Sequence, residues 1–147
     1  MTKLIQAFLT GVFFTFILDF QFFLGVKLHY IDRYEIDVYY NILFADYQNL
    51  LYLTPLVVII GFMTTYVKNV KIPLITLGIL FAVTLLIYIP SLGEKVGAYM
   101  LQKKGVEYRD GRYTYKGTLY YDGRKKITIF DDELQRLITL NKKDLQK

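Results

Sequence analysis

Three long segments almost free of charged residues occupy the first two thirds of the chain. They cover about residues 4–26, 50–67 and 72–92, and the only charged residue within them is Asp19. At ~1.5 Å of rise per residue, about 18 apolar residues cross the roughly 30 Å hydrocarbon core of a bilayer. A chain of 147 residues is too small to bury three helices that are apolar on every side. The sequence therefore predicts three transmembrane helices.

The first apolar segment is too long for a cleavable signal peptide, whose apolar part has about 7–15 residues. The residues at its end, Gly25–Leu28, do not form a small-residue cleavage site. We therefore expect a retained membrane anchor. The sequence has no cysteine, which excludes disulfides and Cys-ligated metals. We expect no metal and no cofactor.

A tyrosine-rich and acidic stretch separates the first two spans. Within it, Ile36, Tyr40, Leu43, Tyr47 and Leu50 recur at helical spacing. This pattern favours an amphipathic helix over about residues 34–49 that lies at the membrane interface, with its tyrosines at headgroup level. The alternative is a plain polar loop.

The second and third spans are joined by only four residues, 68–71, so they must form a tight antiparallel hairpin. Pro73 falls at the start of the third helix, where a missing N–H costs little, and Pro90 falls near its end. Residues 94–104 are expected to continue as a short helix, and Gly105 is a reasonable residue to end it.

The last third of the chain changes to β-type patterns. Asp110-Gly111 and Asp122-Gly123 stand between β-prone runs, and Asp-Gly is a strong signal for a type I′ hairpin turn. The predicted strands are Val106–Arg109, Arg112–Tyr121, Lys125–Phe130 and Gln135–Leu140. The sequence thus predicts a membrane α+β protein, in which three transmembrane helices are followed by a small antiparallel β meander.

We place the boundary between a transmembrane region, residues 1–104, and a small extramembrane β domain, residues 105–147. A domain of about 40 residues usually needs disulfides, a metal or a partner surface. The meander is therefore expected to dock on the membrane-proximal helices, on a copy of itself or on another subunit. Lys116-Gly117-Thr118-Leu119 and Ile127-Thr128-Ile129-Phe130-Asp131 resemble segments of SH3-like or Sm-like small barrels.

Asp19 is the most unusual residue of the spans. It lies eight residues before Lys27, hence about 12 Å inside that boundary, and intramembrane acids often mark ion paths or polar partners. A row of small residues, Ala7, Gly11 and Thr15, shares its helix face and favours close helix packing. We expect Asp19 to be protonated and hydrogen-bonded to Gln21, a threonine or a tyrosine, or paired with a base of another subunit. Structural packing, partner docking and proton or ion conduction remain open.

Several titratable residues outside the spans indicate a function less specifically than Asp19 does. A basic cluster is expected to bind lipid headgroups or to be a solvated face; it comprises Lys95, Lys103, Lys104 and Arg109. His29, the only histidine, is expected to be interfacial. Residues 131–133 form an acidic triplet that suits a turn or a divalent cation. Residues 124–126 are a basic run that we interpret as a strand edge protected against aggregation.

These features favour a non-catalytic accessory or scaffold subunit of a larger membrane complex. Its transmembrane face around Asp19 and its β tail would serve assembly with other subunits or with copies of itself. The alternative is a small ion- or proton-translocating component in which Asp19 titrates; a lipid-modifying enzyme has the least support, since no catalytic motif is present. The formal charge of +5 suits membrane lipids better than nucleic acid.

The orientation in the membrane follows from the basic residues near the span ends. With the tail inside, the cytoplasm receives Lys27, Arg33 and the basic cluster, whereas Lys3, Lys68 and Lys71 lie outside. The reverse orientation has fewer basic residues inside. We therefore expect an integral protein of a bacterial inner membrane with a cytoplasmic tail.

Overall fold

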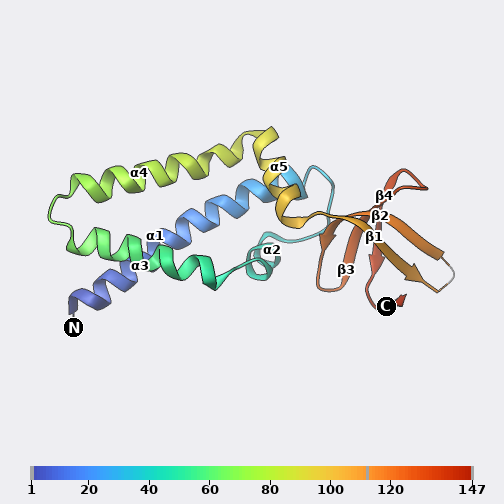
Figure 1. The fold of residues 1–147 in the computed structure, drawn as a ribbon, viewed down its shortest axis with the longest axis horizontal. Helices are drawn as coiled ribbons and strands as arrows, with labels where there is room; N and C mark the ends of the chain where they lie inside the picture. Colours follow the sequence, from blue (N-terminus) through green and yellow to red (C-terminus); the bar gives the residue numbers. More distant parts are fainter. Residues whose placement is uncertain (1, 112, 147) are drawn as a thin grey trace.

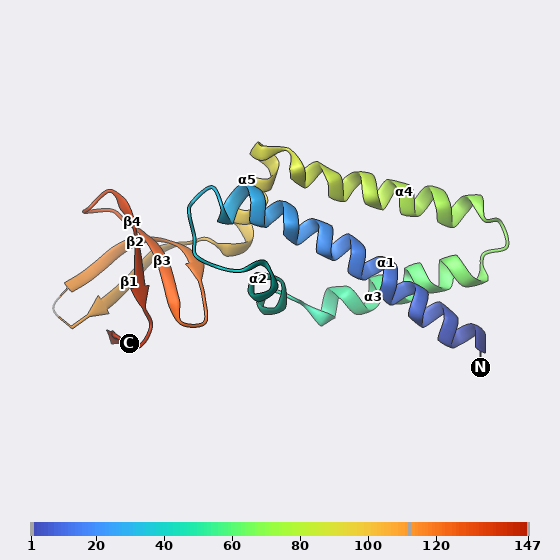
Figure 2. The same ribbon diagram turned by 180° about the vertical axis from the view of Figure 1, so that it is seen from behind.

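Helices form the first part of the chain, and an antiparallel sheet follows them (Figure 1). The computed structural model describes residues 2–111 and 113–146. Met1, Arg112 and Lys147, which the predicted domains and strands include, lie outside the described residues. The molecule is elongated, with the N-terminus at the far end of the helices and the sheet at the opposite end (Figures 1 and 2).

Two helices are long and apolar enough to cross a membrane. The first is α1 (Thr2–Val26), which continues as a π-helical turn to Ile31, and the second is α4 (Lys71–Leu85), extended by a 3₁₀ turn to Tyr88. A third candidate is α3 (Leu50–Tyr66) when it is joined to α2 (Tyr40–Asp46) across a bend of 90°. The chain therefore has two to three helices suited to span a bilayer, where the sequence predicts three.

The interfacial helix predicted over residues 34–49 is wrong outside α2. Glu35 has a left-handed φ of 52°, and residues 36–39 are extended or irregular. The backbone N–H of Ile36 donates to the carbonyl of Ile31, 3.0 Å away, and the Ile36 side chain is buried. Helical spacing was misleading here because Ile36 is buried against the sheet, not along a helix stripe.

The third predicted helix, residues 72–92, also ends earlier than expected. Ile89 is extended, which is the conformation favoured before a proline, and Pro90 occupies the first turn of a new helix, α5 (Pro90–Leu101). The short helix predicted over 94–104 is therefore α5, shifted toward the N-terminus. Gly105, predicted as a helix stop, lies within the first strand instead.

Five strands form one antiparallel sheet with the order β4-β3-β2-β1-β5. Their bounds are β1 Lys103–Asp110, β2 Tyr113–Asp122, β3 Lys126–Asp131, β4 Arg136–Asn141 and β5 Leu145–Gln146. β4 and β5 lie at opposite edges, yet only residues 142–144 connect them. The sheet must therefore bend strongly enough to bring its two edges together.

Asp110 and Asp122 do not occupy the central turn positions predicted for the Asp-Gly pairs, because each ends a strand. In the first hairpin Asp110 pairs with Tyr113, and Gly111, which follows Asp110, has a φ of 48°. In the second, Gly123 does not have a positive φ. Glycine is needed there for space, because a Cβ at position 123 would lie 2.8 Å from the Lys126 carbonyl oxygen.

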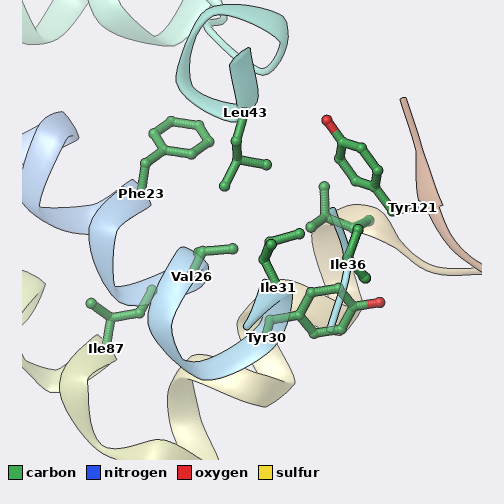
Figure 3. Close-up of a cluster of buried hydrophobic side chains, with 9 residues drawn as sticks. Phe23, Val26, Tyr30, Ile31, Ile36, Leu43, Ile87 and Tyr121 are labelled. Carbon is green, nitrogen blue, oxygen red and sulfur yellow. The ribbon is translucent and has the colours of Figure 1, made fainter. Parts of the chain in front are cut away.

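A hydrophobic core joins the sheet to the helices (Figure 3). It contains Phe23 and Val26 of α1, Leu43 of α2 and Tyr121 of β2, with further residues from α5 and the loops. The Tyr30 hydroxyl donates to the Tyr120 carbonyl, 2.9 Å away. A second, smaller core lies within the sheet and contains Leu119, Ile127, Ile129 and Leu140. The sheet thus packs against the helices of its own chain.

Candidate functional site at Asp19

Asp19 lies beside the break between α2 and α3. The side-chain amide of Gln48 donates to the Asp19 carboxylate, and Gln48 is one of the residues that separate the two helices. The expected partner Gln21 instead donates to the Thr84 hydroxyl, 3.0 Å away. Residues 19 and 21 are about 200° apart around a helix, so their side chains point in nearly opposite directions and form hydrogen bonds with different segments.

The sequence around Gln48 ends one helix and starts another. Tyr47 closes α2, with its N–H donating to the Leu43 carbonyl at 3.2 Å. Asn49 begins α3, because its side chain accepts the N–H of Leu51 at 3.0 Å, a typical N-cap. Between these two caps, the Gln48 side chain turns toward α1 and reaches Asp19.

The small-residue row of α1 packs against α3. A Cβ at Gly11 would lie 2.0 Å from the Val57 carbonyl oxygen, and a Cβ at Gly61 would lie 2.1 Å from that of Ala7. The two backbones are therefore in direct contact, as small residues permit. Ala7, Gly11 and Thr15 are all buried, so this face of α1 is covered by its own chain.

An apolar groove of about 300 Å³ runs along α1 and α3, with Asp19, Thr15 and Thr54 among its lining residues. Thr15 is only 3% exposed, and its hydroxyl has no hydrogen-bond partner among the described residues. A carboxylate and an unpartnered hydroxyl in apolar surroundings can both accept a hydrogen bond. The groove therefore offers acceptors to a donor group that enters it.

Asp19 lies at the level of the helix ends. Its partner Gln48 stands two residues before α3, and the Gln21–Thr84 hydrogen bond lies at the end of α4. α1 continues another twelve residues, to Ile31, and these residues join the core beneath the sheet. The 12 Å depth expected from Lys27 assumes that the apolar layer extends to that residue, whereas α3 begins and α4 ends in a polar layer at the level of Asp19.

The residues of the predicted headgroup cluster lie on two elements. Lys95 lies on α5, and Lys103 and Lys104 begin β1; all three are exposed. Arg109 is five residues further along the strand, roughly 17 Å away at 3.3 Å per residue. Arg109 therefore lies away from Lys103 and Lys104, near the opposite end of β1.

The acidic triplet forms a turn. Asp131 is 2% exposed, and its carboxylate accepts the backbone N–H groups of Glu133 and Leu134 at 2.9 and 2.7 Å. Within residues 2–111 and 113–146, no group of three acids or histidines is arranged to hold a metal ion. His29 packs against Gly93 of α5.

Sequence reasoning missed a polar junction around Glu94. Its carboxylate accepts the Tyr34 hydroxyl at 2.7 Å and pairs with the Arg33 guanidinium at 3.0 Å. Burial, and then Glu94, raises the pKa of Tyr34 to about 12, so the phenol keeps its proton and donates. Tyr34 and Glu94 are 60 residues apart, so no local sequence pattern predicts their hydrogen bond.

The chain matches no protein-family model, no curated protein and no solved structure.

Proposed function

We propose that the chain is a non-catalytic accessory or scaffold subunit of a larger membrane complex. The observation that carries this proposal is the open surface of α4. Only 11% of the apolar segment Lys71–Tyr88 is buried, and its buried Leu77 packs with Leu18 of α1 and Ile60 of α3. Figures 1 and 2 show α4 running beside these helices along one side of the molecule.

Gly78 supports a helix of another subunit as the occupant of this surface. A Cβ at Gly78 would have no atom of the chain within 4 Å, and Ala82, one turn later, is also exposed. Glycine lowers helix stability by about 1 kcal/mol relative to alanine. Small residues one turn apart let a second membrane helix approach closely. The Ala7 row is already covered by α3, so α4 is the surface we assign to the partner.

The sheet offers a second contact for assembly. Within the described residues, β4 pairs with β3 on one side and with no strand on the other. An open edge strand can accept a strand of a partner.

The bent sheet also fits an SH3-like barrel, the finer architecture that we propose for the tail. We place the tail in the cytoplasm of a bacterial cell, with Lys3, Lys68 and Lys71 outside the inner membrane.

Purification in mild detergent, followed by mass spectrometry, tests the subunit proposal. Gly78→Leu should remove the co-purifying protein, because the larger side chain keeps the partner helix away. Val83→Leu is the matched control: it enlarges an exposed residue of the same helix about 140° around the axis. A wild-type chain that purifies alone as a monomer would contradict the proposal. Mixed tagged and untagged copies would show whether the partner is a second copy.

The second candidate is a small ion- or proton-translocating component. The position of Asp19 beside a helix break favours it, since broken helices line ion sites in many transporters. Asp19→Asn keeps an acceptor for Gln48 but removes the titratable proton. Lost proton flux in vesicles with intact assembly would favour translocation. Lost co-purification with unchanged flux would favour the subunit role. If neither the flux nor the co-purification changes, Asp19 has no part in translocation or in assembly.

A further inference from the structure

A cleft lies between residues 36–42 and the β2–β3 hairpin. It has a volume of about 550 Å³. Apolar side chains that include Tyr39 and Ile42 form one wall, residues 123–126 form the opposite wall, and Tyr121 also lines it. Neither Asp19 nor the α4 surface contributes to this cleft, so its role is independent of the proposed subunit function.

Three consecutive cations line the cleft. Arg124 pairs with Asp46 at 2.5 Å, and Lys126 pairs with Asp37 at 3.6 Å. The Asp37 side chain is 81% exposed, so its pair with Lys126 is weak and exchangeable. Lys125 has no ion-pair partner among the residues that the structure describes. Three cations against two carboxylates leave the wall with a net positive charge.

Tyr121 adds a buried donor. Its side chain is only 4% exposed, and its hydroxyl has no hydrogen-bond partner among the described residues. Burial raises the pKa of Tyr121 to about 12, so the phenol stays protonated at neutral pH. A buried hydroxyl without a partner costs stability, and a bound acceptor would remove that cost. Tyr121 lines the cleft beside the basic wall; a negatively charged oxygen acceptor would meet the basic side chains first and would accept from this occluded hydroxyl after a small opening of the wall.

We infer that the cleft binds the phosphate of an anionic phospholipid headgroup, with Lys125, Arg124 and Tyr121 as its donors. Membrane lipid is favoured over free phosphate by the position of the cleft. Asp46, the partner of Arg124, ends α2 four residues before α3 begins. The first residues of α3 are among the most exposed apolar groups of the chain, with Leu50 at 75% and Leu51 at 76%. Lipid that surrounds this end of α3 would bring its headgroups to Arg124.

Native mass spectrometry of the full chain, released from vesicles of phosphatidylcholine with a minor share of phosphatidylglycerol, tests this inference. The wild type should retain phosphatidylglycerol in excess of its share. Lys125→Gln should lower that retention about fivefold, as expected for one basic residue at a membrane surface, and leave the fold intact because no ion pair is broken. Tyr121→Phe should also lower it, while thermal stability stays equal or rises, because the ring remains and the unpartnered hydroxyl is removed.

Lys116→Gln is the control, since Lys116 lies on β2 five residues before Tyr121 and does not line the cleft; its ion pair with Glu107 is between two exposed side chains and contributes little to stability. This variant should retain phosphatidylglycerol like the wild type. Equal losses in Lys116→Gln and Lys125→Gln would mean general attraction to an anionic surface and would overturn the site. Delipidated protein is titrated in parallel with inorganic phosphate by NMR. Phosphate shifts at Tyr121 without lipid enrichment would overturn the lipid assignment in favour of a free anion.

Discussion

Gly11 and Gly78 both lie within apolar helices, but their surroundings are opposite. A side chain at Gly11 would collide with the backbone of α3, whereas one at Gly78 would meet no atom of the chain. Gly11→Leu should therefore lower the free energy of unfolding by about 3 kcal/mol, the upper end for overpacking. Gly78→Leu should leave it unchanged or raise it by up to about 1 kcal/mol, because leucine is the better helix former and the space around position 78 is open. Denaturant unfolding in detergent, followed by circular dichroism, measures both. Equal effects would contradict the close α1–α3 contact.

Tyr34 makes the junction with α5 sensitive to alkaline pH. Its folded pKa of about 12 lies above the unfolded value of about 10, so the folded state holds the phenol proton more tightly. The resulting stabilisation is complete below pH 10 and is lost as the pH rises through 12. Thermal unfolding between pH 8 and 12 should show this loss, and Tyr34→Phe should reduce it. An unchanged pH profile in Tyr34→Phe would contradict the assignment.

The strand β1 contains a bulge that the sequence reveals only in part. Gly105 was predicted to need the backbone freedom of a helix end; it does have a φ of 67°, but at an irregularity between Lys103 and Val106 in the pairing with β2. The space around it is open. Gly105→Ala should therefore cost only the conformational strain, about 1 kcal/mol, and Gly105→Asn less. A loss far above this value in denaturant unfolding would indicate packing at this site.

At the scale of the whole molecule, the sequence predicts the helices and the strands better than the contacts that join the sheet to the helices. Apolar length predicts the helices, and alternation with Asp-Gly pairs predicts the strands, because both signals are local. The small-residue row also identified the α1 face that meets α3. Gln48 and Glu94 were missed because each meets a partner far away in the sequence, at 29 and 60 residues. The loop around Ile36 was misread because its burial depends on Tyr121, which follows 85 positions later.

This junction should control how firmly the sheet is held. Ile36 is 6% exposed, in the core shared by α1, α2 and β2, so Ile36→Ala should lower stability by about 2–5 kcal/mol. If the small inner core of the sheet is insufficient alone, sheet amides should exchange hydrogen much faster in this variant, while amides at the α1–α3 contact stay protected. Ile59→Ala, a change at an exposed residue of α3, is the control and should leave the sheet unchanged. Unaltered sheet exchange in Ile36→Ala would show that the five strands hold together without the helices, and the tail would then be an independent domain.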